Sequence, residues 1–235
     1  MNGQQPLKGK MVLIYTRNGE GYVHDNIASS VAALERICDG EGILHESSDD
    51  PGLFTKENLA RYDAIIFCNS NNEAFLEESQ REAFKDYIMS GKGFGAIHSA
   101  NASERDWPWY REMLGGKFLR HPPYQEFDVV MTDTLHPSTR ELPKRWTVKD
   151  ECYYSYQLNP RIHVLMCADL NTVEDEQKEQ YPGQTWEDKI PLSWTHDYAG
   201  GRQWYSALGH DPGFYSDPLL VAHLRGGVRW ILGGN

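Results

Sequence analysis

The sequence predicts an α/β fold in which a doubly wound, mostly parallel sheet carries antiparallel additions in its C-terminal half. In the first half of the chain, short apolar runs alternate with segments of helical periodicity. In the second half, strand-like runs follow one another without long helices between them, which is typical of antiparallel pairs. The 235 residues contain no repeat and no interdomain linker, so we expect residues 1–235 to form one domain.

Four short runs in the first half are the expected parallel strands. Glycine or polar residues flank them, and their lengths are those of buried strands. The third run is apolar almost throughout, so we expect helices to cover both of its faces. The four runs are residues 10–16, 42–47, 62–69 and 93–98.

Helical patterns separate these runs. Residues 24–38 place apolar side chains at helical spacing, and Gly40 ends that helix. Thr55 is the expected cap of a short helix. Residues 76–91 predict an amphipathic helix with acidic residues in its first turn. This alternation of strand and helix is what a doubly wound sheet requires.

The second half predicts further strands, a turn and a closing helix. Residues 197–201 form the turn between the last two strands. The closing helix begins after Asp217, and Gly226 and Gly227 within it indicate close packing against the sheet. The polar, acidic segment 171–189 exceeds the usual loop length and is expected to form a lid, an insertion or an exposed flap. The strands are residues 126–133, 151–158, 161–169, 190–196 and 202–210.

Composition excludes several classes of function. The formal net charge is −11, which argues against a nucleic-acid partner and against an anionic membrane surface. No apolar run is long enough to predict a transmembrane helix, and the first residues lack the apolar core of a signal peptide. The four cysteines form no CxxC pair, so we expect reduced thiols and a cytoplasmic location.

Three histidines fall at the expected carboxyl ends of strands, where doubly wound sheets bind ligands. His24 follows the first strand, His98 ends the fourth, and His210 ends the last strand if that strand runs parallel to the first four. His196 begins the turn at the opposite end of the last hairpin, on the order of 25 Å from His210 at about 3.3 Å per residue. We therefore expect His24, His98 and His210, and not His196, to line one pocket.

Other residues near these histidines are candidates with a structural alternative. Glu151 follows Asp150 and either belongs to a solvated turn or acts as a general acid or base, with Tyr153 beside the ligand. Trp109, in an aromatic segment, is either core or a platform for a sugar ring. Ser99 is a candidate ligand contact. It is not an expected nucleophile, because the segment lacks the G-x-S-x-G pattern, and no cysteine occupies the strand tip.

Taken together, the motifs resemble the ThuA-like family, which is named for trehalose utilisation. The resemblance runs from about residue 10 to 232 and rests on GYVHDNI, GKGFGAIHSA, FLRHPPYQEFDVVMTD, DECYY and GGRQWYSALGHDPGFYSDP. It implies a fold like that of class I glutamine amidotransferases. In that fold His98 takes the position of the catalytic cysteine and His210 that of the catalytic histidine. It also implies a role in the catabolism of disaccharides or keto sugars, alongside sugar oxidoreductases.

The residues leave three functions open. In the first, His98 and His210 act as acid and base on a sugar, assisted by Glu151. In the second, His24, His98 and His210 hold a divalent metal ion. In the third, the protein binds sugars or regulates without catalysis. The sequence contains no close-spaced H-x-H or H-E-x-x-H pair, which favours the first over the second. No other cofactor is expected, and self-association stays open.

Overall fold

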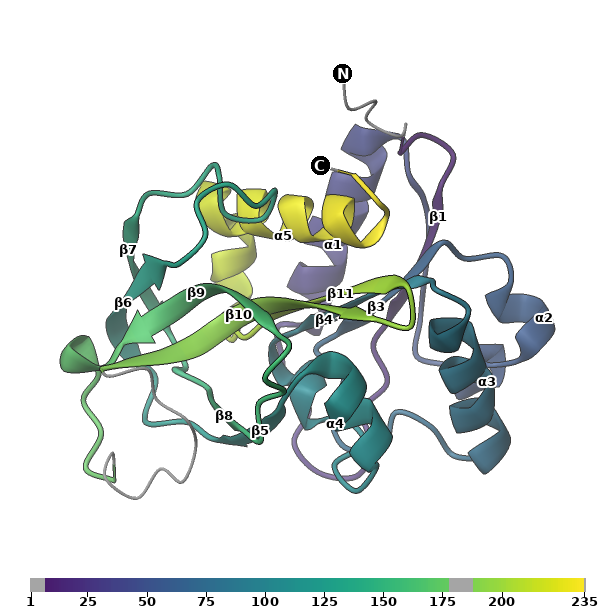
Figure 1. Ribbon diagram of the computed structural model, residues 1–235, viewed down its shortest axis with the longest axis horizontal. Helices are drawn as coiled ribbons and strands as arrows, with labels where there is room; N and C mark the ends of the chain where they lie inside the picture. Colours follow the sequence, from purple (N-terminus) through teal and green to yellow (C-terminus); the bar gives the residue numbers. More distant parts are fainter. Residues whose placement is uncertain (1–6, 178–187, 235) are drawn as a thin grey trace.

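A computed structural model describes residues 7–177 and 188–234 of the chain. Within these residues, nine strands form one mixed sheet in the order β2-β1-β3-β4-β11-β10-β9-β6-β7. Residues 178–187, which belong to the acidic segment 171–189, lie outside the description. The predicted α/β fold with a doubly wound sheet is confirmed (Figure 1).

The parallel part of the sheet comes from the first half of the chain and one late strand. β3 is buried at all five positions, as expected for a strand covered on both faces. β11 pairs in parallel with β4, so the last strand runs in the direction predicted for it. The parallel strands are β1 (Met11–Tyr15), β2 (Leu44–Ser48), β3 (Ala64–Cys68), β4 (Gly93–Ile97) and β11 (Gly201–Ser206).

The antiparallel part extends the sheet from β11. Ala199 and Gly200, both with positive φ, make the tight turn between β10 and β11. A separate two-stranded sheet pairs β5 with β8. The strands are β10 (Lys189–Tyr198), β9 (His163–Asp169), β6 (Gln125–Met131), β7 (Arg145–Asp150), β5 (Lys117–Arg120) and β8 (Tyr154–Tyr156).

Helices cover both faces of the sheet. α1 and α5 lie on one face, and α3 and α4 lie on the other (Figure 1). Asp217 caps α5, as predicted, because its Oδ1 accepts hydrogen bonds from the amides of Leu219 and Leu220. The helices are α1 (Ile27–Glu41), α2 (Lys56–Leu59), α3 (Glu78–Met89), α4 (Pro108–Leu114) and α5 (Pro218–Ile231).

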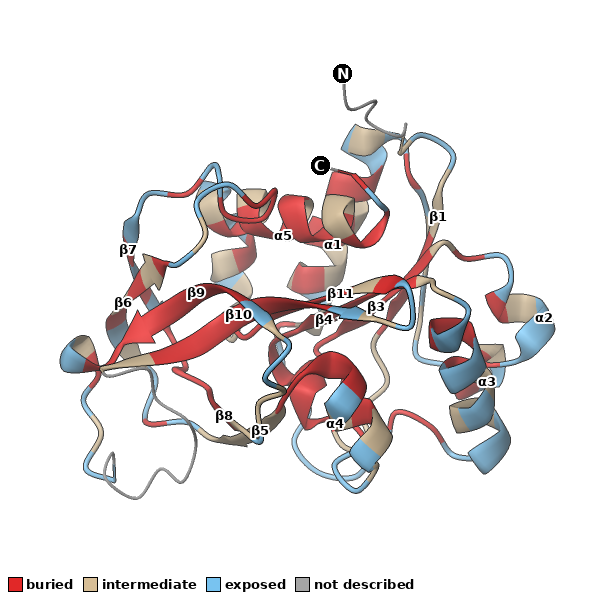
Figure 2. Cartoon of the chain, in the orientation of Figure 1, coloured by how far each residue is buried: buried red, intermediate tan, exposed pale blue. Residues whose placement is uncertain are grey.

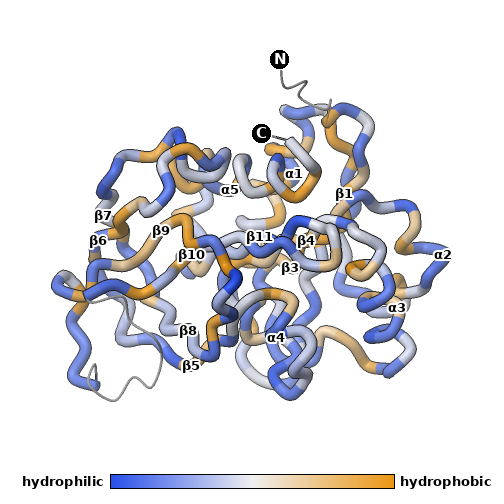
Figure 3. The backbone as a smooth tube through the Cα atoms, in the orientation of Figure 1, coloured by the Kyte–Doolittle hydropathy of each residue, from blue (hydrophilic) through white to orange (hydrophobic). Residues whose placement is uncertain are grey.

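Burial follows this layering. Buried residues run through the central strands and the inner faces of the helices, whereas exposed residues gather on the outer turns (Figure 2). Figure 3 shows the same contrast, with hydrophobic residues along β9 and hydrophilic ones along outer loops. No helix in residues 7–177 and 188–234 combines the length and apolar character needed to span a bilayer.

Three elements differ from the sequence-based expectation. The strand predicted for residues 151–158 is only Tyr154–Tyr156, and it pairs with β5 outside the main sheet. The main-sheet strand lies one segment earlier, at β7, and its exposed and buried residues alternate strictly. β5 and α4 were not expected. α4 begins at Pro108, a residue that favours the first helical position.

Candidate functional site

The site centres on a strained residue at the end of β4. His98 has φ 51°, the left-handed conformation, and begins a 3₁₀ turn directly after the strand. This backbone costs a residue other than glycine about 1–2 kcal/mol and is found mainly at functional positions. A strained residue between a strand and a helical turn is the geometry that exposes a catalytic nucleophile in α/β enzymes. Here that position holds an imidazole.

The hydrogen bonds of His98 define its tautomer. Its Nδ1 lies 2.7 Å from the carbonyl oxygen of Ala207 and therefore donates to it. Its Nε2 is then free to accept, and the Tyr153 hydroxyl donates to it at 3.0 Å. Burial, followed by the nearby charge of His24, lowers the pKa of His98 well below 6.5. His98 is therefore a neutral imidazole with a defined lone pair.

Two further imidazoles meet His98, as the strand-end argument predicts. His24 comes from the loop between β1 and α1, and His210 from the loop after β11. The ring centroids are 4.8 Å apart for His24–His98, 5.5 Å for His24–His210 and 5.6 Å for His98–His210. Burial, followed by the charge of His210, lowers the pKa of His24 to about 4. Three segments distant in sequence thus bring three imidazoles together.

Glu151 is the carboxylate at this cluster. Its Oε2 lies 3.1 Å from His210 Nδ1 and 3.6 Å from His98 Nε2, and its Oε1 lies 3.4 Å from His121 Nε2. The Glu151 carboxylate, as acceptor for the His210 ring, raises the pKa of His210, and burial opposes part of that rise. The candidate acid or base predicted from sequence therefore lies among the predicted histidines.

Asp150 holds the two late segments of the site together. Its buried carboxylate accepts hydrogen bonds from the backbone amides of Gly209 at 2.7 Å, His210 at 3.0 Å and Glu151 at 2.8 Å. Burial raises the pKa of Asp150 to about 7. These bonds fasten the loop after β11 to the end of β7, which places His210 beside Glu151. This positioning role depends on the tertiary fold and could not be predicted from the residues around Asp150.

A buried amide layer supports the site from below. Asn26, next to the His24 loop, donates to the side-chain oxygen of Asn69 at 3.0 Å and to the carbonyl of Gly209 at 2.5 Å. Tyr215 donates to the same Gly209 carbonyl at 2.9 Å. The start of α1, the end of β3 and the loop after β11 are therefore joined by hydrogen bonds, which fixes the relative positions of the segments that carry His24 and His210.

A pocket of about 400 Å³ opens over this cluster. His98 is fully buried and lies in ring contact with His24 and Tyr153, which line the pocket. Among the described residues, the buried His24 Nδ1 and Ser99 Oγ have no hydrogen-bond partner. Such orphaned polar atoms indicate a site built to bind a ligand. The lining residues are Tyr22, His24, Asn71, Ser99, Ala102, Arg105, Phe118, His121, Glu151, Tyr153 and His210.

The cluster has the composition of a metal site. One ligand atom from each of His24, His98, Glu151 and His210 lies within 4.8 Å of all the others. Ligand atoms bound at about 2.0–2.2 Å from one ion stand roughly 3–4 Å apart, so a small contraction would close the set. Because the four residues come from four distant segments, no local spacing in the sequence could reveal them as a set.

Two sequence candidates lie elsewhere. Trp109 is on α4, where its ring packs against Trp107, Phe84 and Tyr198, and it is not among the residues that line the pocket. His196 is on β10 and faces the carbonyl of Met113 at 3.0 Å, also outside the pocket lining. The expected separation of His196 from the three clustered histidines is therefore found. A sugar platform at Trp109 has no support from this placement.

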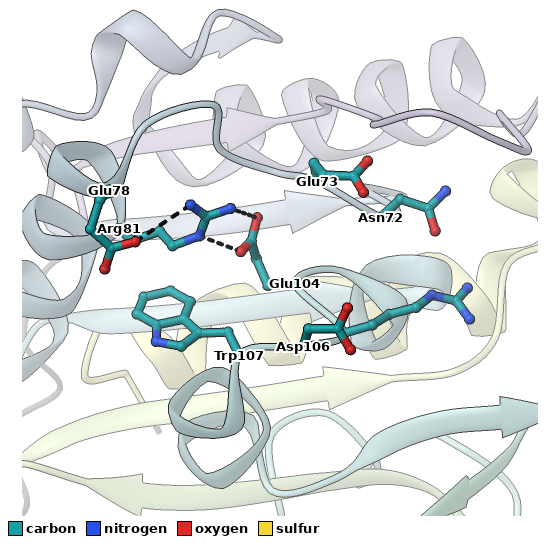
Figure 4. Close-up of a pocket in the computed structure, with 8 residues that line it drawn as sticks. Asn72, Glu73, Glu78, Arg81, Glu104, Asp106 and Trp107 are labelled. Carbon is teal, nitrogen blue, oxygen red and sulfur yellow. Dashed lines mark hydrogen bonds and ion pairs between the residues drawn. The ribbon is translucent and has the colours of Figure 1, made fainter.

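A second pocket, of about 320 Å³, adjoins the first and shares Arg105 with it (Figure 4). Its buried carboxylate, Glu104, lies 2.7 Å from Arg81 Nε and accepts from the amides of Ala74 and Phe75. These bonds engage both carboxylate oxygens, so Glu104 braces the loop before α3. The candidate catalytic and metal-binding residues lie at the first pocket.

Comparison with known proteins agrees with this fold. The ThuA family, described as trehalose utilisation, matches residues 11–231. A ThuA-like protein from Bacteroides uniformis has a TM-score of 0.78 at 21% identity, over 98% of this chain and 95% of that one. Another, from Parabacteroides merdae, has a TM-score of 0.72 at 20% identity, over 96% and 90%. A glutamine amidotransferase from Thermotoga maritima reaches 0.54 at 13% identity, over 95% and 98%. No curated protein sequence matches the chain.

Proposed function

This chain belongs to the ThuA (trehalose utilisation) family, and we propose that it is a sugar-converting enzyme whose reaction centre is a divalent metal ion held by His24, His98, Glu151 and His210. The observation that carries the proposal is the convergence of three imidazoles and one carboxylate at the base of a pocket. Imidazole and carboxylate donors together suit ions such as Zn²⁺ and Mn²⁺.

The surroundings of the cluster support metal binding. His98 donates its Nδ1 proton to the Ala207 carbonyl, as metal-ligating histidines do with outer-shell partners, and this makes Nε2 the atom that would bind an ion in place of its hydrogen bond from Tyr153. Burial keeps His24 uncharged near neutral pH, which is the form that ligates. The unpartnered His24 Nδ1 would gain a partner. When bound, the ion would polarise a sugar carbonyl or lower the pKa of a water molecule.

A sugar is the substrate class that we propose, in line with the family description. Tyr22, Phe118 and Tyr153 give the pocket aromatic walls, and such rings cover the apolar face of a sugar while polar groups bind its hydroxyls. A keto group on that sugar would offer the ion a carbonyl to polarise, and a sugar oxidoreductase is the class of enzyme that would supply it. Cys38, Cys68 and Cys167 are buried free thiols, which favours a cytoplasmic location.

A second candidate function is acid–base catalysis without metal. The ion pair between Glu151 and His210 favours it, because that pair raises the pKa of His210 and so favours an imidazolium acid beside a carboxylate. In this reading His98 acts through Tyr153, since His98 itself is fully buried. A sugar-binding protein without catalysis would use the same pocket for affinity alone.

Metal titration separates these functions. We expect protein stripped with chelator to bind about one equivalent of Zn²⁺ or Mn²⁺ by calorimetry. His24→Ala and Glu151→Gln should weaken binding by more than about 100-fold, the upper end of the loss for an outer-shell partner. His163→Gln is the matched control, because His163 also pairs with a carboxylate, Asp133, but on the surface.

Turnover of a panel of disaccharides and their keto forms completes the test. Under the metal proposal, chelator abolishes turnover and the ion restores it. If the protein takes up no metal and turnover falls only in His210→Gln and Glu151→Gln, acid–base catalysis is the function. If no sugar is turned over but the panel binds, the protein is a binder and the enzyme proposal is wrong.

A further inference from the structure

We propose that Arg105 anchors a carboxylate of the substrate, so that the sugar handled in the histidine pocket is an acid of the aldonate or uronate type. The inference rests on the proposed function in one respect, which is that the histidine pocket is the reaction centre. Arg105 lines this pocket and also forms part of its neighbour.

The bonds of Arg105 leave its charge uncompensated. Its Nε donates to the carbonyl of Ala102 at 3.1 Å, and its Nη2 donates to the side-chain oxygen of Asn71 at 3.4 Å. Both acceptors are neutral. Among residues 7–177 and 188–234, no carboxylate lies within ion-pair distance of Arg105, and its Nη1 has no hydrogen-bond partner. The bonds that exist therefore hold the guanidinium without neutralising it.

Comparable arginines in the same chain do meet carboxylates. Arg81 lies 2.7 Å from Glu104, Arg120 lies 2.7 Å from Asp175, and Arg145 lies 2.6 Å from Asp128. Among the described residues, Arg111 and Arg202 also bond only neutral acceptors, but neither lines the histidine pocket, so what sets Arg105 apart is its place at that pocket without a carboxylate partner. A guanidinium at a pocket wall with free N–H donors suits a carboxylate ligand, because it can donate two parallel hydrogen bonds to the two carboxylate oxygens.

Two aromatic rings of the pocket lie between Arg105 and the histidine cluster. The guanidinium carbon of Arg105 lies 5.8 Å from the centroid of the Phe118 ring. The ring centroids of Phe118 and Tyr153 are 4.4 Å apart, and those of Tyr153 and His98 are also 4.4 Å apart. Two aromatic rings thus separate Arg105 from the cluster. A sugar whose carboxylate binds Arg105 would lie over these rings, with its far carbons beside the cluster.

Ser99 provides an independent observation that the pocket expects a polar ligand. Its side chain is 1% exposed and lines the pocket, yet its Oγ has no hydrogen-bond partner among the described residues. A buried hydroxyl without a partner costs free energy unless a ligand completes it. A sugar hydroxyl between the carboxylate anchor and the cluster would supply that partner.

The test compares acidic and neutral sugars in the metal-loaded protein. We expect gluconate or glucuronate to bind about 10–100-fold more tightly than glucose or trehalose by calorimetry, the gain typical of hydrogen bonds to charged groups. Arg105→Gln should remove that preference and leave binding of the neutral sugars unchanged. Arg105→Lys should keep part of it, because lysine retains the charge but not the paired geometry.

Arg111→Gln is the matched control. Arg111 also bonds a neutral acceptor, Gln157, but lies outside the pocket lining, so this variant should keep the preference for acids. Equal affinity of the parent protein for acidic and neutral sugars overturns the inference, as does an equal loss for both classes in Arg105→Gln. Metal uptake in the same samples tests the proposed function. If metal binds and neutral sugars are turned over without preference for acids, only the role of Arg105 fails. If the parent protein takes up no metal and binds neither class, both proposals fail.

Discussion

The side chain of His98 makes hydrogen bonds in the site, while its backbone adopts a strained conformation. Its φ of 51° lies in the region that glycine adopts freely and other residues adopt at a cost. The structure around it enforces this shape, because the side chain bonds the Ala207 carbonyl and the backbone carbonyl accepts from Tyr205. Strain at this residue is therefore supported by neighbours on β11, and its contribution can be measured separately from that of the imidazole.

Two substitutions at position 98 separate the backbone from the side chain. Both His98→Ala and His98→Gly remove the imidazole, but only glycine relieves the strain. We expect His98→Gly to be more stable than His98→Ala by about 1–2 kcal/mol in chemical denaturation. Ala96→Gly on the regular strand β4 is the control and should instead destabilise by roughly 0.5–1 kcal/mol. Equal stability of the two variants at position 98 would show that the backbone relaxes when the imidazole is removed.

At the scale of the secondary-structure elements, the sequence predicts that α5 packs closely against the sheet. A Cβ atom placed on Gly227 would lie 2.5 Å from the Trp204 ring on β11, and one on Gly226 would lie 2.1 Å from the backbone oxygen of Pro137. The two glycines therefore let the helix approach closer than any larger residue would. The prediction of close packing against the sheet is confirmed for Gly227, whereas Gly226 packs against the loop at Pro137.

Glycine-to-alanine changes in two helices should have opposite signs. Gly227→Ala forces α5 away from Trp204, and overpacking of this kind costs about 1–3 kcal/mol in the free energy of unfolding. Gly40→Ala in α1 meets no atom within 4 Å, so the better helix propensity of alanine should stabilise by roughly 0.5–1 kcal/mol. Thermal or urea denaturation checks both. A neutral Gly227→Ala would mean that α5 can shift without loss.

Strands buried on both faces could be predicted because their apolar runs are uninterrupted, as in β3 and β4. β7 was missed although its residues alternate, because Asp150 is a charged residue at a buried position. Its burial depends on hydrogen bonds from amides of the loop after β11. That loop is distant in the sequence, so the local pattern does not show that it lies beside Asp150. β5 and β8 likewise pair only through the tertiary fold.

The site could be predicted in part for the same reason. His24, His98 and His210 follow strands, and the topology alone brings strand ends together. Arg105 and His121 line the same pocket from irregular segments, whose positions depend on packing around α4 and β5. The FLRHPP motif contains His121, but no spacing argument selects it. Residues that follow the end of a predicted strand were therefore found, and residues on segments that no strand end positions were not.

For the molecule as a whole, buried neutral histidines should make the free energy of unfolding depend on pH. Burial lowers the pKa of His24, His136 and His223 to about 4 each. The unfolded chain takes up these protons below about pH 6.5, whereas the folded protein does so only near pH 4. Stability is therefore full above pH 6.5 and falls as the pH falls through this window, by up to about 1.4 kcal/mol per pH unit for each histidine. The raised pKa values of His210 and of Asp150, the latter about 7, oppose part of this loss, because the folded protein takes up these two protons more readily than the unfolded chain.

A variant of His223 isolates one share of this dependence. His223 lies far from the pocket lining and bonds Ser138 and Ser206 between α5 and the sheet. We expect His223→Gln to be less stable at pH 7.5 and to lose less stability than the parent protein between pH 6.5 and 4.5. His163→Gln, at an exposed site, should follow the parent curve. Urea denaturation across this range is the measurement, and a flat curve for the parent protein would contradict the prediction.

The place of β11 in the sheet has a consequence for how the protein is made. β11 is the last strand in the sequence, yet it lies between β4 and β10, in the middle of the sheet. A chain emerging from the ribosome forms its N-terminal units first. Until residue 206 has emerged, β4 keeps an unpaired edge, and unpaired edges invite contact with other chains. His24, His98 and Glu151 are by then already synthesised but still lack His210, so the histidine cluster is completed only after residue 210 has been translated.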